Sequence, residues 1–187
     1  MRCLLLALEN TEASLLERRM EARMALNIAR VMRDGGRMAP FVVCSKGGFL
    51  DAALREQKIP GMALGRGGAA EVLAALRLRW HCRHWRGVLI QTFGQASVSL
   101  GTAVRRLRPK ETTLLAHAFL MAPPSRTLLQ GRWRRNLAAA DCIFCGSGHV
   151  RERLAEHSLD GPTPQGPGER RLIPLPPAVD SESASLL

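Results

Sequence analysis

The 187-residue sequence contains no tyrosine, and aromatic residues make up only 4% of it. Proteins that bind single-stranded nucleic acid stack bases on aromatic side chains, and few such platforms exist here. Lysine is scarce too: among 27 basic residues only Lys46, Lys58 and Lys110 are lysines, and the rest are arginines. No helix-turn-helix or known RNA-binding motif is present. We therefore expect no specific nucleic-acid partner.

Long apolar runs and a disulfide pattern are missing as well. No segment approaches the roughly 18–20 apolar residues of a transmembrane helix. The short apolar run 1–8 meets Glu9 with no signal-peptide cleavage site behind it. The five cysteines are odd in number and scattered, as in proteins of a reducing compartment. We expect a cytoplasmic protein, with a peripheral position on the inner face of the cytoplasmic membrane left open.

Three motifs of nucleotide-binding and hydrolytic enzymes are absent. The turn after the first apolar run reads Glu9-Asn10-Thr11-Glu12, so the glycines of a dinucleotide-binding fingerprint are missing there. Neither a G-x-x-x-x-G-K-[ST] phosphate loop nor a G-x-S-x-G nucleophile elbow occurs. These absences argue against a nicotinamide or flavin enzyme, and we expect no cofactor.

One cysteine cluster superficially resembles a zinc site. Cys142 and Cys145 are followed by His149 and His157 at spacings seen among zinc ligands. The segment 141–145, however, has the composition of a buried strand. Residues three apart on a strand point to opposite faces, so the two thiolates could not converge on one ion. We expect core cysteines here and no metal.

The remaining composition is that of a globular protein with an unusual charge. Apolar residues make up 46% and charged residues 23%, and the length suits one domain. The net charge is +11. Such a charge permits anionic partners, including a membrane surface, but does not choose among them. A biased genome composition would also explain an excess of arginine.

Apolar strand-like runs alternate with helical patterns along the chain. The expected strands are 2–8, 41–44, 59–64, 87–92, 112–116, 141–145 and 171–174. The expected helices are 16–32, 48–57, 69–80, 96–107, 126–139 and 148–157. This alternation predicts an α/β fold with a doubly wound, mostly parallel, Rossmann-like sheet and helices on both faces. We place one domain at 1–180 and a frayed tail at 181–187.

The spacing of apolar residues predicts which face of each helix is buried. The expected inward residues of the first helix are Leu16, Met20, Met24, Ile28 and Val31 or Met32. Those of the second and third helices are Leu50, Ala53 and Leu54, and Val72, Leu73 and Leu76. Those of the fourth and fifth helices are Leu100, Ala103, Val104 and Leu107, and Leu129, Trp133 and Leu137.

Ligands of doubly wound sheets bind at the carboxyl ends of the strands. The candidate residues at those ends are Asn10, Thr11, Gln91, Phe93, Gly94, His117, Gly146 and Ser147. An imidazole at position 117 could exchange a hydrogen bond or a proton with a substrate hydroxyl, although a lone histidine is as often structural. Gly146 and Ser147 precede a helix, so they could offer backbone N–H groups to an anion, cap the helix, or do both.

Arginines cluster around a tryptophan in the fifth expected helix. Arg132, Arg134 and Arg135 flank Trp133, which we expect to point inward while the arginines point outward. The usual interpretation of such a run is a solvated helix face. The specific alternative is a surface that meets anionic lipid or a phosphorylated acceptor.

Several passages together resemble the N-terminal, acceptor-side domain of family 4 glycosyltransferases of the GT-B fold. The segment 25–43 (ALNIARVMRDGGRMAPFVV) is similar to the family's "LA..L..RGHEV.VV" passage, and 45–64 is similar to "L...L...GIPV..L". Residues 114–118 (LLAHA) resemble a strand ending in "T.H", and 137–150 resemble "ADAVIA.S..V". Residues 171–180 (RLIPLPPAVD) resemble "VIPNGVD", the passage into the second domain.

The resemblance implies an enzyme, a retaining glycosyltransferase that uses a nucleotide-diphosphate sugar as co-substrate and a glycan or lipid-linked acceptor, as in cell-envelope polysaccharide synthesis. His117 takes the place of the family's catalytic-region histidine, and Gly146 and Ser147 fall on its "A.S" turn. Asn10 and Thr11 occupy the first-strand turn, and Gln91, Phe93 and Gly94 would line the acceptor cleft. No metal is implied.

The sequence also departs from the family. The Gly-Gly turn after the first strand is absent, Arg37 replaces the histidine of "RGH", and Ala178 replaces the glycine of "NGVD". The donor-binding domain, with its paired glutamates, lies outside the sequence, so we expect the chain alone to turn over poorly or not at all. The alternative is a non-catalytic, membrane-peripheral or partner-binding module that keeps the fold.

Overall fold

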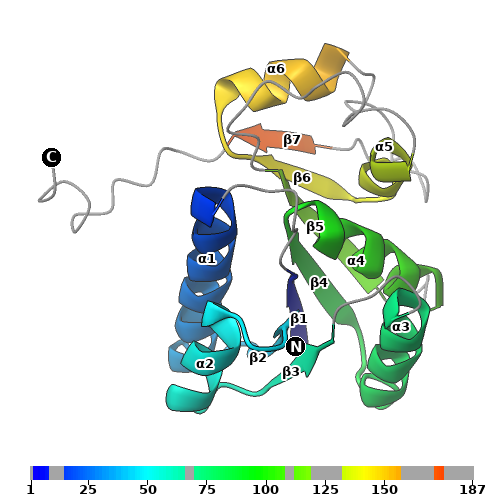
Figure 1. Ribbon diagram of the computed structural model, residues 1–187. Coiled ribbons are helices and arrows are strands. Elements are labelled where there is room, and N and C mark those ends of the chain that lie inside the picture. The colour runs from blue at the N-terminus through cyan, green and yellow to red at the C-terminus, as the bar shows by residue number, and fades with distance from the viewer. Residues whose placement is uncertain are drawn as a thin grey trace, which may run out of the picture.

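The computed structural model describes residues 2–8, 15–65, 70–107, 112–118, 132–156 and 171–174. These residues form one sheet of seven strands with helices packed on both of its faces (Figure 1). The strands are β1 (Arg2–Ala7), β2 (Ala39–Ser45), β3 (Gly61–Leu64), β4 (Val88–Phe93), β5 (Thr112–Ala118), β6 (Cys142–Cys145) and β7 (Arg171–Pro174). The described helices are α1 (Leu15–Asp34), α2 (Phe49–Glu56), α3 (Ala70–His81), α4 (Gln95–Leu107), α5 (Arg132–Leu137) and α6 (Gly148–Glu156).

All the paired strands run parallel, in the order β3-β2-β1-β4-β5-β6-β7. The chain first builds outward from β1 to β3 and then returns to the other side of β1 with β4. The reversal places the topological switch point between β1 and β4, where doubly wound sheets hold their ligands. The predicted α/β, doubly wound, Rossmann-like architecture is confirmed.

Alternating side chains of the central strands supply two separate cores. Cys3, Leu5 and Ala7 of β1 face α1 and α2, whereas Leu4 and Leu6 face the core that contains α3, α4, α5 and α6. Figure 1 shows α1 and α2 on one side of the sheet and α3 and α4 on the other. Burial on both faces explains why β1 reads as a continuous apolar run rather than an alternating one.

The predicted inward face of α1 is rotated away from the observed one. Ala22, Ala25, Leu26, Ala29 and Met32 are the buried residues, with Met20, Met24 and Ile28 packed at the side of this core. Of the two residues that we predicted as alternatives at the end of this face, Met32 is buried and Val31 is 73% exposed. Small alanines let the helix approach the sheet closely, and the larger Met20 and Met24 lie at the edges of the contact.

The predicted inward face of α3 is wrong in the same way. Its buried residues are Ala74, Ala75 and Leu78, whereas Leu73 and Leu76 are exposed. The side chains of Leu16, Val72 and Leu129 lie outside the described residues. The predicted faces of α2 and α4 are confirmed, as are Trp133 and Leu137 of α5.

A buried ion pair joins the second half of the sheet to its helices. The Arg105 guanidinium, 5% exposed, donates to a carboxylate oxygen of Asp141 at 2.6 Å and to the carbonyl of Ala139. The other carboxylate oxygen of Asp141 accepts the backbone N–H of Leu114 at 2.8 Å. Asp141, in the turn before β6, thereby links Arg105 of α4 to the backbone of β5.

Candidate functional site

The carboxyl ends of β1, β4, β5 and β6 lie at one edge of the sheet because the strands are parallel and in register. This edge holds Gln91, Phe93, Gly94, Gly146 and Ser147 with His117. Phe93 and His117 lie inside β4 and β5, rather than in the turns after them, because both strands run further than predicted. Asn10 and Thr11 lie outside the described residues.

His117 is held between two aromatic rings from the neighbouring strands. The register pairs it with Phe93 of β4 on one side and Phe144 of β6 on the other. The ring centroids are 4.5 Å from Phe93 and 4.8 Å from Phe144, with interplanar angles of 15° and 19°. Only 5% of His117 is exposed. The three side chains therefore form one stacked row across the strand ends.

Burial sets the protonation state of His117. Removal from water disfavours the charged imidazolium and lowers the pKa of His117 from 6.5 to about 4. The imidazole is consequently neutral at pH 7. A neutral ring can donate or accept a hydrogen bond, but it supplies no positive charge to a ligand.

The turn after β6 combines a sheet hydrogen bond with a helix cap. The N–H of Gly146 donates to the carbonyl of Ala118 at 2.9 Å. The Ser147 hydroxyl accepts the N–H of Val150 at 3.2 Å, so its predicted role as N-cap of α6 is confirmed. Ser147 and Gly148 are exposed at the same edge of the sheet. The turn is thus open to a ligand, and its contact with an anion stays a prediction.

Gly94 closes β4 in a conformation that favours glycine. Its φ is +78°, and a Cβ atom there would collide with the carboxylate of Glu21. Glu21 projects from α1 and is 7% exposed. A carboxylate from the first helix therefore lies directly against the backbone at the end of β4, at the switch point of the sheet.

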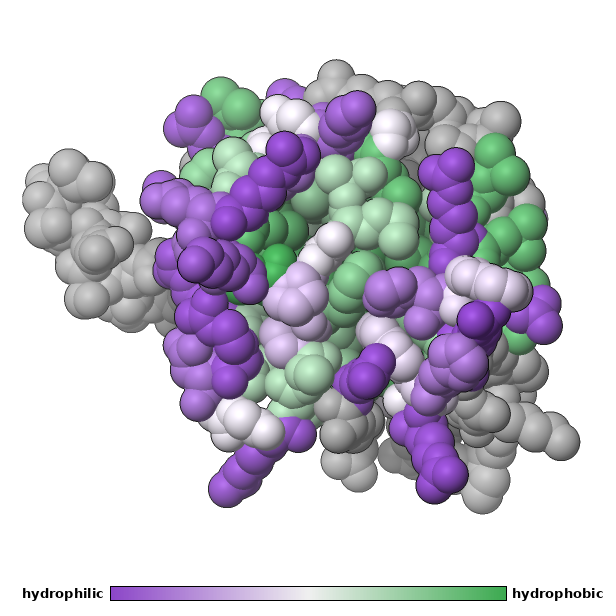
Figure 2. Space-filling view, turned by 90° about the horizontal axis from the view of Figure 1, so that it is seen from below, coloured by the Kyte–Doolittle hydropathy of each residue, from purple (hydrophilic) through white to green (hydrophobic). Residues whose placement is uncertain are grey.

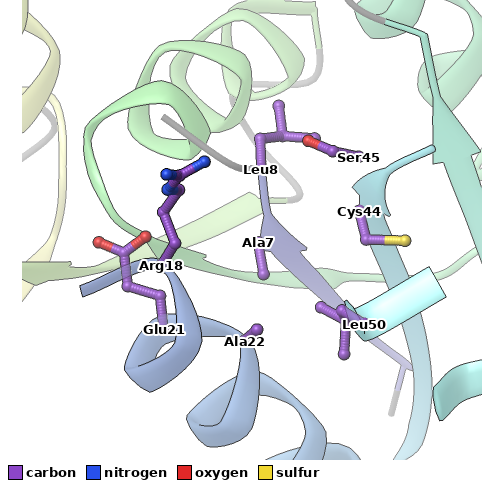
Figure 3. Close-up of a pocket in the computed structure, with 8 residues that line it drawn as sticks. All are labelled: Ala7, Leu8, Arg18, Glu21, Ala22, Cys44, Ser45 and Leu50. Atoms are coloured by element: carbon purple, nitrogen blue, oxygen red, sulfur yellow. The ribbon is translucent and has the colours of Figure 1, made fainter. Parts of the chain in front are cut away.

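Glu21 and Arg18 line a narrow pocket at this edge, and sequence reasoning missed both. The pocket is also lined by Leu8 at the end of β1, Ser45 at the end of β2 and Leu50 of α2. Figure 3 shows both charged side chains extending from the same side of α1. For Glu21 a signal was present in the sequence, because this residue lies beside Ala22 and Ala25 on the face of the helix that carries small residues.

The arginines of α5 lie partly as predicted. Trp133 is 8% exposed and packs into the core, while Arg134 and Arg135 are exposed. The side chain of Arg132 lies outside the described residues. The carbonyl of Asn136 in α5 accepts from the Thr102 hydroxyl of α4, and the Asn136 side chain donates to Ser99, so α5 packs alongside α4.

The two cysteines of the cluster lie in β6, in the described part of the chain. Cys145 is fully buried in the same core as Ile143, and Cys142 is half-buried. No group of three histidines, cysteines or carboxylates able to hold a metal ion occurs among the described residues. His157 lies outside them. None of the described helices is long and apolar enough to span a bilayer.

No protein-family model matches the sequence, and no curated protein is similar to it in sequence. Solved structures do match the fold. Anabaena HepE in complex with UDP and glucose matches with a TM-score of 0.61 and 18% identity over 83% of this chain. A glycosyltransferase from Rickettsia africae gives 0.56 at 12% identity, and the lipopolysaccharide outer core galactosyltransferase WaaB gives 0.55 at 10%.

The chain spans about two fifths of these proteins, with 41% of HepE, 39% of the Rickettsia enzyme and 42% of WaaB covered. HepE has been solved with UDP and with UDP-glucose. At these identities the likeness shows the fold: the chain has the architecture of one domain of a GT-B glycosyltransferase.

Proposed function

We propose that this chain is the acceptor-side domain of a retaining, family 4-like glycosyltransferase. It would act on a nucleotide-diphosphate sugar and a glycan or lipid-linked acceptor, such as a precursor of cell-envelope polysaccharide. The observation that carries the proposal is a GT-B match over most of this chain and only 41% of HepE, a protein solved with UDP and glucose. A separate donor-binding domain would supply the rest of the active site.

The strand-end edge supports an acceptor-binding role. His117 would offer a neutral imidazole, and Gly146 and Ser147 a turn at a helix N-terminus, while Gly94 leaves room for the Glu21 carboxylate beside them. Gln91 and Phe93 would shape the floor beneath them. Asn10 and Thr11, in the segment that follows β1, would complete this edge. His117 is the residue to which we assign a part in the chemistry.

Catalysis in such an enzyme comes from placing two substrates and from stabilising the departing diphosphate. This chain would place the acceptor, and the donor-binding domain would contact the diphosphate. The proposal needs no metal and no nucleophile from residues 1–180, nor any role for the tail 181–187.

The experiment is a sugar-transfer assay with radiolabelled UDP-glucose and an extract of glycan and lipid acceptors. The chain alone is compared with the chain fused to the donor-binding half of HepE. The proposal predicts acceptor-dependent transfer by the fusion and little or none by the chain alone. Transfer by residues 1–187 alone would contradict the division of labour between two domains.

A second candidate function, a membrane-peripheral module, is favoured by the exposed face of α3. Leu73, Leu76 and Trp80 are 57%, 47% and 69% exposed and follow helical spacing along one side. The guanidinium of Arg83 lies 3.6 Å from the centroid of the Trp80 ring. An apolar row beside arginines and an exposed tryptophan is typical of helices that rest at a bilayer interface.

The charge around α3 selects the type of surface. The sequence from Val72 to Lys110 contains eight arginines and lysines and no aspartate or glutamate. Arg77, Arg79, Arg83 and Arg86 are exposed. Figure 2 shows apolar and strongly hydrophilic residues next to each other at its right-hand edge, the side on which α3 lies in Figure 1. The surface therefore complements anionic lipid rather than a neutral bilayer.

Liposome co-sedimentation separates this surface from the arginines of α5. Arg77→Gln, Arg79→Gln and Arg83→Gln together should weaken binding to phosphatidylglycerol vesicles by about 100-fold, since each arginine contributes roughly 1 kcal/mol near such a surface. Arg132→Ala, Arg134→Ala and Arg135→Ala test the surface predicted from the sequence, and Phe49→Ala, on the other side of the sheet, is the matched apolar control. Binding that is indifferent to lipid charge would contradict this function.

A further inference from the structure

The pocket between α1 and the ends of β1 and β2 is lined by a buried carboxylate and by an arginine whose Nε atom is shielded from solvent. Glu21 is more than nine-tenths buried, a rare position for a carboxylate that faces a ligand-binding edge. Arg18 is half-buried, and its Nε atom is shielded from solvent. Within the part of the chain that the structure describes, this Nε–H has no hydrogen-bond acceptor. A shielded donor of this kind needs an acceptor from outside the protein or from solvent.

Contacts from three elements position the site. The Leu8 N–H, at the end of β1, donates to the Ser97 hydroxyl of α4 at 2.7 Å, which fixes the strand end beneath the pocket. The Glu21 carboxylate lies against Gly94, where a side chain would not fit. Ser45 closes the opposite wall at the end of β2. Side chains positioned by packing in this way are suited to orient a ligand.

The chemistry of the two groups selects a hydroxyl. A hydroxyl both donates and accepts, so it can donate to the Glu21 carboxylate while it accepts from the Arg18 guanidinium. A phosphate or carboxylate would be repelled by Glu21 at the same point. The pocket has room for about one water-sized group at most, which suits the protruding hydroxyl of a larger molecule.

We propose that Arg18 and Glu21 form a hydroxyl-binding subsite for a sugar or another neutral polyol at the switch point of the sheet. The inference rests on the proposed function, because an acceptor-side domain must bind a hydroxyl-bearing molecule. It adds two binding residues on α1 that neither the sequence motifs nor the stacked row around His117 supply. Arg18 and Glu21 orient the ligand and are not assigned a chemical step.

The test is saturation-transfer NMR on the full chain with D-glucose and myo-inositol as neutral probes and inorganic phosphate as the anionic probe. Glu21→Gln keeps the size of the side chain and removes its charge, and Arg18→Met keeps the stem and removes the donors. Each should weaken polyol binding by about tenfold or more, as expected for a hydrogen bond to a charged group. Arg19→Met, an exposed position on the same turn, is the matched control and should bind as the wild type does.

The outcomes are distinguishable from failure of the proposed function. Polyol binding that is unchanged in both α1 variants overturns the subsite, whatever the transfer assay shows. A wild-type chain that binds neither polyol, or binds phosphate in preference, overturns it too. Loss in both variants with native circular dichroism supports the subsite, and it does so even if no sugar transfer is found with the HepE donor half.

Discussion

Lowering the pH from 7 to 4 should destabilise the domain through His117 by roughly 3 kcal/mol. The ordinary pKa of the imidazole is 6.5, and burial between Phe93 and Phe144 lowers it to about 4. One pKa unit corresponds to about 1.4 kcal/mol, so the difference between a pKa of 6.5 and a pKa of about 4 gives roughly 3 kcal/mol. Between these pH values the unfolded chain binds a proton at His117 and the folded chain does not. Stability is therefore full above pH 6.5 and is lost as the pH falls to 4.

The assay is urea unfolding of the wild type and His117→Phe at pH 7, 6, 5 and 4. Phenylalanine can stack in the same row and does not titrate, so the variant should lose about 3 kcal/mol less than the wild type over this range. Asp51 does not confuse the comparison. The backbone N–H of Gly47, followed by Arg55, lowers the pKa of Asp51 below its ordinary 3.8. Its effect on stability therefore begins only as the pH approaches 4, and it is the same in the wild type and the variant.

A direct readout accompanies the unfolding series. The ring Cε1–H resonance of His117, followed by NMR between pH 3 and 8, should titrate with a midpoint near 4. A midpoint near 6.5, or equal loss of stability in the wild type and His117→Phe, would refute the argument that the stacked row excludes water from this imidazole.

Three further predictions concern packing and charge. Asp141→Asn leaves the buried guanidinium of Arg105 without its ion pair and should cost about 3 kcal/mol in urea unfolding, whereas Arg153→Gln, in an exposed pair with Glu156, should change stability by well under 1 kcal/mol. Gly101→Ala should cost about 1–3 kcal/mol, since a Cβ there would lie 2.5 Å from the Thr92 methyl group, and an unchanged melting curve would contradict this. Gly94→Ala should destabilise the protein through its positive φ and through the collision with Glu21. In a double-mutant cycle, Glu21→Ala should partly restore the lost stability, and strictly additive effects would contradict the contact between the two residues.

The order and type of the elements followed from the sequence because each strand is a short apolar run bounded by polar or glycine residues. Leu4, Leu5 and Leu6 are buried on alternating faces, so the whole run is apolar and marks a central strand. The parallel arrangement followed from the alternation of strands and helices. The full length of β5 did not follow from the sequence. The apolar run ends before His117, whereas the strand continues through it to Ala118.

The helix faces were harder to predict where apolar residues occur on more than one side. In α3 the sheet contacts Ala74, Ala75 and Leu78, while Leu73 and Leu76 remain exposed. A hydropathy pattern predicts that the larger leucines are buried, but close packing of the helix against the sheet places the smaller alanines at the contact. The same effect hid Glu21, whose burial depends on the backbone of Gly94, a contact between residues 73 positions apart that no local pattern records.

The central claim is that this chain supplies the acceptor side of a two-domain glycosyltransferase. The most direct measurement is incorporation of radiolabelled glucose from UDP-glucose into a glycan or lipid fraction by the chain fused to the HepE donor half. We predict incorporation that requires both halves and falls when His117 is replaced by alanine. Incorporation by the chain alone would contradict the account. So would equal incorporation by the HepE donor half when this chain is left out.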